Sequence, residues 1–196
     1  MGELSTYFVS AFIGIGLAAA TGFRVFMPLF LLSIGSRLEL FQVDSEWAWT
    51  GSNLVLMTTS VAMLIEVLAF YIPVVDNMLD GLSIPLAAIS GTALFALQFT
   101  EIDPLFRWSM AILAGGGTAA TISTAMAGTR AATSLGTAGL GNFVVATLET
   151  IGSTILTILA LFVPFMAILV VIGLFYFFWK FGKKQFRRKW RKTKKG

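Results

Sequence analysis

The sequence predicts an all-α membrane protein with about six transmembrane helices, arranged as a 3+3 inverted repeat whose first and fourth helices are broken. The chain of 196 residues is 57% hydrophobic and only 12% charged, and its mean hydropathy is +0.85. That is more apolar surface than a soluble domain of this size can bury. Several apolar runs approach the roughly 20 residues needed to cross about 30 Å of hydrocarbon. We therefore expect one polytopic transmembrane domain over 1–181.

The first half-repeat, over about 5–100, is predicted to contain three spans. Its N-terminal run is apolar but lacks the basic residues that begin a signal peptide, so we expect it to be the first span. That run is longer than one straight crossing, and its glycines are the expected break points. After a polar link, Trp47 and Trp49 suit an aromatic belt at the start of the second span. The predicted spans are Ser5–Ile34, Thr50–Val75 and Ser83–Phe99, with a tight turn at 73–81 before the third.

The second half-repeat, over about 103–181, is predicted to begin at Asp103, whose side chain can cap a helix with Pro104 at its first position. The fourth span runs from there to about Thr133 and is rich in small residues, which let helices approach closely. A loop of glycine, threonine and serine follows. The last apolar block is too long for one crossing, so we divide it at Pro164 into the fifth and sixth spans.

The two halves share an order of features that predicts a repeat. In each half, a span rich in small residues carries the pattern Gly-x-Arg, and the next span carries one lone glutamate. Because each half contains an odd number of spans, the second half must be inverted relative to the first.

The positive charge of the chain is concentrated at its C-terminus. Ten of the 14 lysines and arginines lie between Lys180 and Lys195. A basic cluster beside the last apolar helix stays in the cytoplasm, so six spans place both termini on the cytoplasmic side. We expect the tail, 182–196, to lack regular structure and to contact anionic lipid headgroups, at about 1 kcal/mol per charge. No nucleic acid is expected as a partner.

Four charged residues lie inside apolar runs, where insertion of a charge costs about 2.5–3.5 kcal/mol. Two are arginines, Arg24 and Arg130, each in the pattern Gly-x-Arg, and two are glutamates, Glu66 and Glu149. Small residues share a helix face with each glutamate, which predicts that both carboxylates lie in seams between helices. These charges are where we expect the function.

Glycines at a helix break expose backbone N–H groups, which together with a guanidinium form a fork for phosphate or carboxylate. We therefore predict a binding site for a small anion or an anionic lipid headgroup. The predicted substrate-binding residues are Arg24, Arg130, Gly22, Gly128, Thr129 and Asn142. The carboxylates predicted to take up protons or to balance the arginines are Glu66 and Glu149, with Asp76 and Asp80 at the cytoplasmic end.

The ordered motifs between about Ala18 and Pro164 resemble a family of integral membrane proteins catalogued as domain of unknown function 4126. They are Glu66-x6-Pro73-x2-Asp76-x3-Asp80, then Gly115–Ala120, Ala127–Ala132, and Gly139-Leu140-Gly141-Asn142-x6-Glu149. The resemblance implies a protein of the bacterial cytoplasmic (inner) membrane and no particular activity. This chain differs at two places: members of the family often carry a basic residue where Phe70-Tyr71 stands and Glu-Asp where Glu149-Thr150 stands.

Two classes of function remain open. In the first, the protein is a proton-coupled transporter that moves its substrate by alternating exposure of the site. In the second, it is a non-transporting scaffold or lipid-binding protein, and its Arg/Glu pairs, Arg24 with Glu66 and Arg130 with Glu149, are structural. An enzyme is not expected, because the chain has no His or Cys and no legible pairing of a serine with a base. We expect no metal or other cofactor; the expected partners are membrane lipids, the anion and, in a homodimer, a second copy of the chain.

Overall fold

The chain folds into a bundle of α-helices, and the part that the structure describes contains no strand. The computed structural model describes residues 2–41, 45–137 and 139–193, except the side chains at 2, 3, 73, 74, 76, 77, 181, 182 and 184–193. The elements are α1 (Gly2–Phe23), α2 (Phe26–Arg37), the 3-10 helix η1 (Ser45–Gly51), α3 (Asn53–Ala69), α4 (Pro73–Ala96), α5 (Pro104–Met110), the π-helical segment η2 (Ala111–Gly116), α6 (Gly117–Thr137), α7 (Asn142–Phe162) and α8 (Pro164–Thr193).

Several of these helices are long and apolar enough to cross a membrane, so the protein is a multi-pass membrane protein. Within the described residues, four stretches meet this criterion: Leu4–Phe23, Met78–Ala96, Pro104–Thr137 and Asn142–Phe162. A fifth is added if η1 and α3, which meet at an angle of 57°, count as one span. The apolar part of α8, Pro164–Lys180, is shorter. The all-α class is thus confirmed, whereas six spans and an inverted repeat are not.

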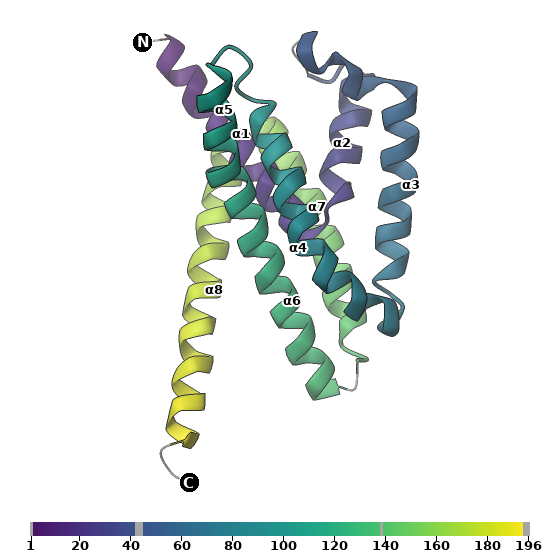
Figure 1. Cartoon of the computed structure of the whole chain (residues 1–196), viewed down its shortest axis with the longest axis vertical. Helices are drawn as coiled ribbons and strands as arrows, with labels where there is room; N and C mark the ends of the chain where they lie inside the picture. Colours follow the sequence, from purple (N-terminus) through teal and green to yellow (C-terminus); the bar gives the residue numbers. More distant parts are fainter. Residues whose placement is uncertain (1, 42–44, 138, 194–196) are drawn as a thin grey trace.

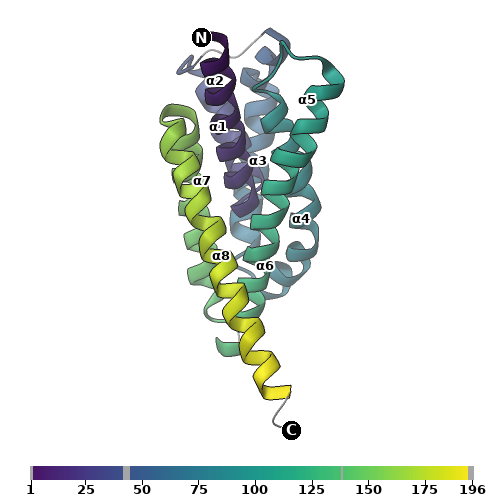
Figure 2. The ribbon, with the colours of Figure 1, turned by 90° about the vertical axis from the view of Figure 1, so that its left-hand side faces the viewer.

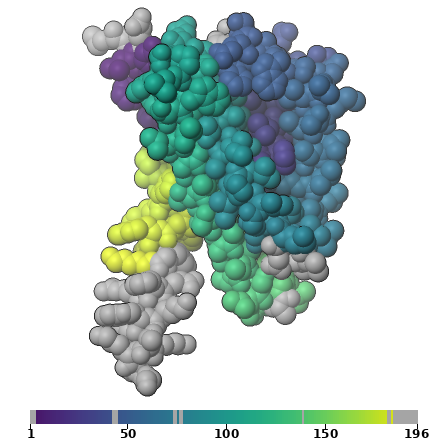
Figure 3. Space-filling model, in the orientation of Figure 1, coloured from purple at the N-terminus to yellow at the C-terminus, as the bar shows by residue number. Residues whose placement is uncertain are grey.

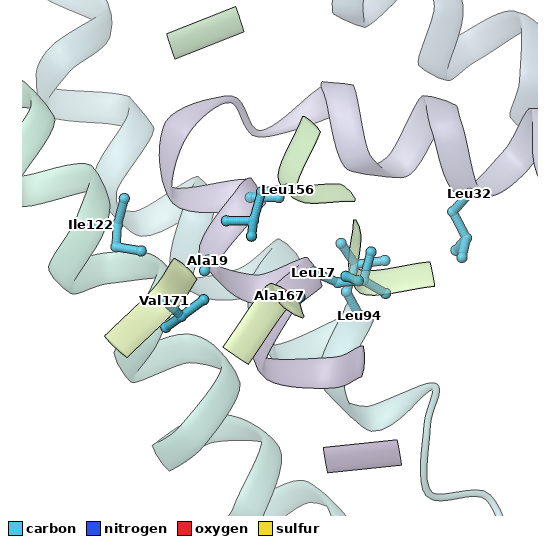
Figure 4. Packing of buried hydrophobic residues seen from close by; sticks show 10 residues of the cluster. Leu17, Ala19, Leu32, Leu94, Ile122, Leu156, Ala167 and Val171 are labelled. Atoms are coloured by element: carbon cyan, nitrogen blue, oxygen red, sulfur yellow. The ribbon is translucent and has the colours of Figure 1, made fainter. Parts of the chain in front are cut away.

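Helix α1 lies at the centre of the bundle and packs against α4, α6, α7 and α8 (Figure 2). Small residues allow this close approach, which drives helix association where water is absent. A Cβ added at Gly16 would lie only 2.7 Å from the Cβ of Ala160 in α7. The core around α1 draws on all four neighbouring helices (Figure 4) and includes Leu17, Leu94, Ile122, Leu156, Ala167 and Val171.

The chain reverses direction between α1 and α2. In Figure 1, α1 runs from the N-terminal end of the molecule into the bundle, and α2 returns toward the same end. Arg24 and Val25 connect the two helices. The predicted break in the first span is therefore present, but its two parts run in opposite directions instead of continuing as one crossing. The two chain termini lie at opposite ends of the longest axis (Figure 1).

The segment 73–81, which the sequence predicts to be a tight turn, is instead the start of α4. Pro73 stands at the first helical position and follows Ile72, whose backbone is extended. Proline is well tolerated there because its missing N–H would have no partner within the helix anyway. The reversal between α3 and α4 thus occurs at 70–72, and the first turns of α4 carry Asp76 and Asp80.

The fourth predicted span is not broken at its Gly-x-Arg pattern, so that prediction is wrong. Helix α6 continues without interruption through Arg130 to Thr137. The irregular part of this span is η2, which lies one to two turns after its start and ends with two glycines. A Cβ added at Gly115 would lie 2.6 Å from the carbonyl oxygen of Gly91 in α4, so these glycines serve close packing.

Two predicted helix boundaries are confirmed. The side chain of Asp103 accepts hydrogen bonds from the backbone N–H groups of Leu105 (3.0 Å) and Phe106 (3.3 Å) and so caps α5. Helix α7 ends just before Pro164, where α8 begins. Helix α8 then continues to Thr193, so the backbone of most of the tail is helical where the sequence predicts no regular structure.

Figure 3 shows one face of the bundle, on which η1 and α3 (blue) lie beside α4 to α6 (teal to green).

Candidate functional site

Arg24, in the connection between α1 and α2, has no solvent-exposed surface. Its Nη2 donates a hydrogen bond to the carbonyl oxygen of Ala146 in α7 (2.9 Å) and lies 3.6 Å from a carboxylate oxygen of Glu149. Its Nε and Nη1 are buried and have no hydrogen-bond partner among the described residues. The guanidinium is therefore held by α7 through one nitrogen, and its other two nitrogens donate to no described group.

Glu66, near the end of α3, caps the start of α2. One carboxylate oxygen accepts a hydrogen bond from the backbone N–H of Val25 (2.7 Å), and the other accepts one from Phe26 (2.9 Å). A carboxylate is well placed at the positive end of a helix. The backbone N–H groups that the break exposes are thus bound by this protein carboxylate, and not free for a substrate as the sequence-based interpretation supposes.

Arg130, in the middle of α6, joins two carboxylates from other helices. Its Nε donates to a carboxylate oxygen of Asp80 in α4 (2.7 Å), and its Nη1 donates to Glu149 in α7. Because the same Glu149 oxygen also lies near Arg24, one carboxylate connects both arginines. The predicted pair Arg130–Glu149 is present. The predicted pair Arg24–Glu66 does not form a direct contact among the described residues; Arg24 pairs with Glu149 instead.

The ring of Phe70, directly after α3, contacts both guanidiniums. The Cζ atoms of Arg24 and Arg130 lie 4.2 Å and 4.4 Å from the ring centroid, within the range of cation–π attraction. The ring is almost completely buried. Sequence reasoning did not place this residue in the site, although two signals pointed to it: its spacing of one helical turn from Glu66, and the departure from the family pattern at Phe70-Tyr71. We refer to Arg24, Glu66, Phe70, Asp80, Arg130 and Glu149 together as the charged cluster.

Three predicted site residues lie outside the charged cluster. Gly128 and Thr129 are on the exposed face of α6, and the Thr129 hydroxyl donates to the carbonyl oxygen of Ala125 in its own helix (2.8 Å). Asn142, at the start of α7, is buried and donates to the hydroxyl of Ser134 (2.8 Å), which ties α7 to α6. The pattern Gly-x-Arg thus places only its arginine in the cluster when the helix is continuous.

Two further predicted residues have other outcomes. Gly22 is buried against α6, where an added Cβ would lie 2.6 Å from the Cβ of Ile122. It therefore lets α1 approach α6 and does not face the cluster as a ligand-binding group. The backbone of Asp76 belongs to the first turns of α4, and its side chain lies outside the described residues.

A separate ion pair joins η1 to α5 near the end of the bundle where the N-terminus lies (Figure 1). Arg107 donates to both carboxylate oxygens of Glu46, at 2.9 Å and 3.0 Å, in a bidentate fork. The arginine is buried, whereas about half of the Glu46 side chain is exposed, at 49%. This pair needs no further residue to balance it, unlike the charged cluster.

The charged cluster contains one more carboxylate than arginines among its described side chains. Neutrality therefore requires either one protonated carboxylate or the partial positive charge at the start of α2. The described residues contain no group of three or more His, Cys, Asp or Glu side chains that could hold a metal ion. Carboxylates of this kind can exchange protons, and the buried guanidinium N–H groups of Arg24 can donate hydrogen bonds.

A model of a known protein family matches most of the chain. Residues 11–184 match the family described as Domain of unknown function (DUF4126). No curated protein and no solved structure matches the sequence.

Proposed function

This chain belongs to the DUF4126 family, and we propose that it is a small transporter of the bacterial cytoplasmic membrane that binds a small anion at Arg24 and takes up a proton with it. The site of the proposed binding is the charged cluster. The anion is an inorganic or short organic oxyanion, or the headgroup of an anionic lipid.

The observation that carries the proposal is the unfilled hydrogen-bonding capacity of Arg24. Its Nε and Nη1, which carry three of the five N–H bonds of an arginine, are buried without a described partner. A buried donor left without an acceptor costs about 1–3 kcal/mol. An oxyanion supplies acceptor oxygens and negative charge at once, and guanidinium is the side-chain group best matched to carboxylate and phosphate.

Charge balance supports the coupling to protons. The charged cluster already has an excess of one carboxylate, so an anion that entered alone would add to a negative charge in a medium of low dielectric constant. Protonation of Glu66, Glu149 or Asp80 offsets that charge. We therefore expect anion binding to strengthen as pH falls, because the protonated cluster is the form that accepts the anion.

The basic tail and the place of the N-terminus support a particular orientation of the protein in the membrane. The basic tail is expected in the cytoplasm, and the N-terminus lies at the other end of the molecule (Figure 1). We propose an extracytoplasmic N-terminus, with α1 and α2 as a re-entrant pair. The alternative is six spans with both termini cytoplasmic. Because the native chain has no Cys, labelling of intact cells with an impermeant thiol reagent distinguishes them: Leu4→Cys reacts only in the first arrangement, and Thr137→Cys, the control, reacts in neither.

A non-transporting scaffold is the second candidate, and one observation favours it. Each charged side chain of the cluster already has an ionic or hydrogen-bonding partner in the protein, and together they join the connection before α2, α2 itself, α3, α4, α6 and α7. In that case the network serves only to hold the helices together. Transport measurements separate the two candidates, because a scaffold moves no solute.

The experiment is uptake of radiolabelled phosphate, acetate and other short organic anions into proteoliposomes, with an imposed pH gradient. We expect at least one anion to be taken up by the wild type when the outside is acidic. Arg24→Lys keeps the positive charge beside Glu149 but removes the fork, so uptake should be lost. Arg107→Lys makes the same change in the ion pair with Glu46 and should leave uptake unchanged. Folded wild type that moves none of these anions favours the scaffold.

A further inference from the structure

A cavity lies at the end of the bundle where α2 ends and η1 begins, and none of the charged cluster's residues is in its lining. Its volume is about 760 Å³. One wall comes from the end of α2 and the residues after it, and the other comes from η1 and the residue after it. The residues that line the cavity include Ser36, Arg37, Glu39, Phe41, Gly51 and Ser52.

The walls of this cavity are fixed to each other. The hydroxyl of Ser33 in α2 donates to the carbonyl oxygen of Thr50 in η1 (2.7 Å). Gly51 lies so close to α2 that an added Cβ would be 2.8 Å from the Oγ of Ser36. The cavity is therefore part of the folded structure and does not depend on a ligand to form it.

Two opposite charges border the cavity without neutralising each other. Arg37 and Glu39 have no ion pair among the described residues, although only one residue separates them. Glu39 has a φ of 53°, in the left-handed region that usually belongs to glycine at this position after a helix. The backbone bonds of that helix end are present, from Leu40 N–H to Gly35 (3.0 Å) and from Glu39 N–H to Ser36 (3.2 Å). A carboxylate is thus held beside a guanidinium at an open, polar cavity.

Exposed apolar side chains next to the cavity indicate that its occupant is a lipid. Leu38, Leu40 and Trp49 are each more than half exposed, at 61%, 56% and 55%. Trp49 also lies against Trp47, with ring centroids 5.8 Å apart, and tryptophans concentrate at the level of lipid headgroups. A polar cavity bordered by apolar side chains that point outward matches a headgroup continued by its acyl chains.

We propose that this cavity binds the headgroup of a zwitterionic phospholipid with a primary ammonium, phosphatidylethanolamine. Arg37 binds the phosphate, and Glu39 accepts hydrogen bonds from the ammonium. A choline headgroup has no N–H to donate and is bound less well, and an anionic glycerol headgroup offers Glu39 neutral hydroxyls but no positive charge. The site lies in the leaflet opposite the basic tail, and its existence does not depend on the transport function proposed above.

The experiment is thermal unfolding of the full chain in detergent with added ethanolamine, choline or glycerol phospholipid of equal chain length. We expect the ethanolamine lipid to raise the melting temperature of the wild type most. Glu39→Gln should reduce the response to the ethanolamine lipid alone, with binding about two- to fivefold weaker, the effect of one exposed ion pair. Arg37→Gln should weaken the response to all three lipids.

Glu101→Gln is the matched control, since this carboxylate is also exposed but lies outside the cavity lining. It should behave as the wild type. Equal responses to ethanolamine and choline lipids in the wild type, or an unchanged preference in Glu39→Gln, would overturn the proposal. A response to free phosphoethanolamine as large as that to the lipid would also overturn it, because the occupant would then be a solute.

Discussion

The two Gly-x-Arg segments of this protein have the same pattern and opposite local structures. Arg24 stands where α1 ends and the chain reverses, whereas Arg130 stands inside the continuous helix α6. Gly22 is packed tightly against α6, whereas a Cβ added at Gly128 would meet nothing within 4 Å among the described residues. Both guanidiniums nevertheless reach the same carboxylate, Glu149, and the same ring, Phe70.

Because a glycine two residues earlier accompanies both the break at Arg24 and the continuous helix at Arg130, glycine permits a helix break but does not cause one. A break inside a membrane leaves backbone N–H groups without partners, and each such group costs free energy there. Next to Arg24, these N–H groups donate to Glu66 from another helix. Glu66 lies 41 positions along the chain from Val25, one of the two donors. In α6 the backbone around Arg130 keeps its helical hydrogen bonds, so no outside acceptor is required.

The largest expected effect concerns the arginine in the continuous helix. Arg130→Leu leaves the carboxylates of Asp80 and Glu149 without their main partner, and breaking a buried pair in this way costs about 3–5 kcal/mol. Arg24→Leu should cost less, because Glu149 keeps its contact with Arg130. The free energy of unfolding of both variants, measured by titration with a denaturing detergent, tests this order. Equal losses of stability in the two variants would contradict the conclusion that Arg130 is the main partner of Glu149 and Arg24 the lesser one.

The next effect concerns the acceptor at the break. Val25 and Phe26 donate to different carboxylate oxygens of Glu66. Glu66→Gln removes the charge and turns one of these oxygens into an NH2 donor, so it should cost about 1.5–3 kcal/mol. Ser52→Ala removes the ordinary cap of α3, a single hydrogen bond of 3.3 Å to the N–H of Val55, and should cost about 1 kcal/mol. If the two variants are equally stable, Glu66 is not what holds the break.

The smallest effects should differ in sign between the two glycines. Gly22→Ala forces a Cβ against Ile122 and the carbonyl oxygen of Ala119, and overpacking of this kind costs about 1–3 kcal/mol. Gly128→Ala adds a methyl group to an exposed helix interior and should stabilise the protein by about 0.5–1 kcal/mol. Melting temperatures in one detergent are sufficient for this comparison. A loss of stability in both variants would mean that α6 has a close neighbour at Gly128.

Features that depend on neighbours in the chain could be predicted from the sequence. The helical class follows from composition, the start of α5 from Asp103 and Pro104, and the division at Pro164 from proline chemistry. The glycines before Arg24 also indicate where a break is permitted. The arginines and glutamates could be chosen as the centre because charges in apolar runs need a reason to be there.

Features that depend on distant contacts could not be predicted. Arg24 binds the carbonyl oxygen of Ala146, 122 positions along the chain, and no local pattern specifies that contact. The reversal after α1 depends on Glu66. The turn at 70–72 leaves the ring of Phe70 against two arginines from different halves of the chain. The inverted repeat suggested by the matching motifs is not confirmed, and the backbone is broken at Arg24 but continuous at Arg130.

In the proposed function, Arg24 binds an anion and the charged cluster takes up a proton with it. The most direct test is calorimetric titration of the purified protein with phosphate and short carboxylates, in buffers of different ionisation enthalpy, which gives the number of protons taken up per anion bound. We expect the wild type to take up close to one proton for each monovalent anion bound, and Arg24→Lys to bind no anion. Anion binding without proton uptake, or equal binding in Arg24→Lys, would contradict it.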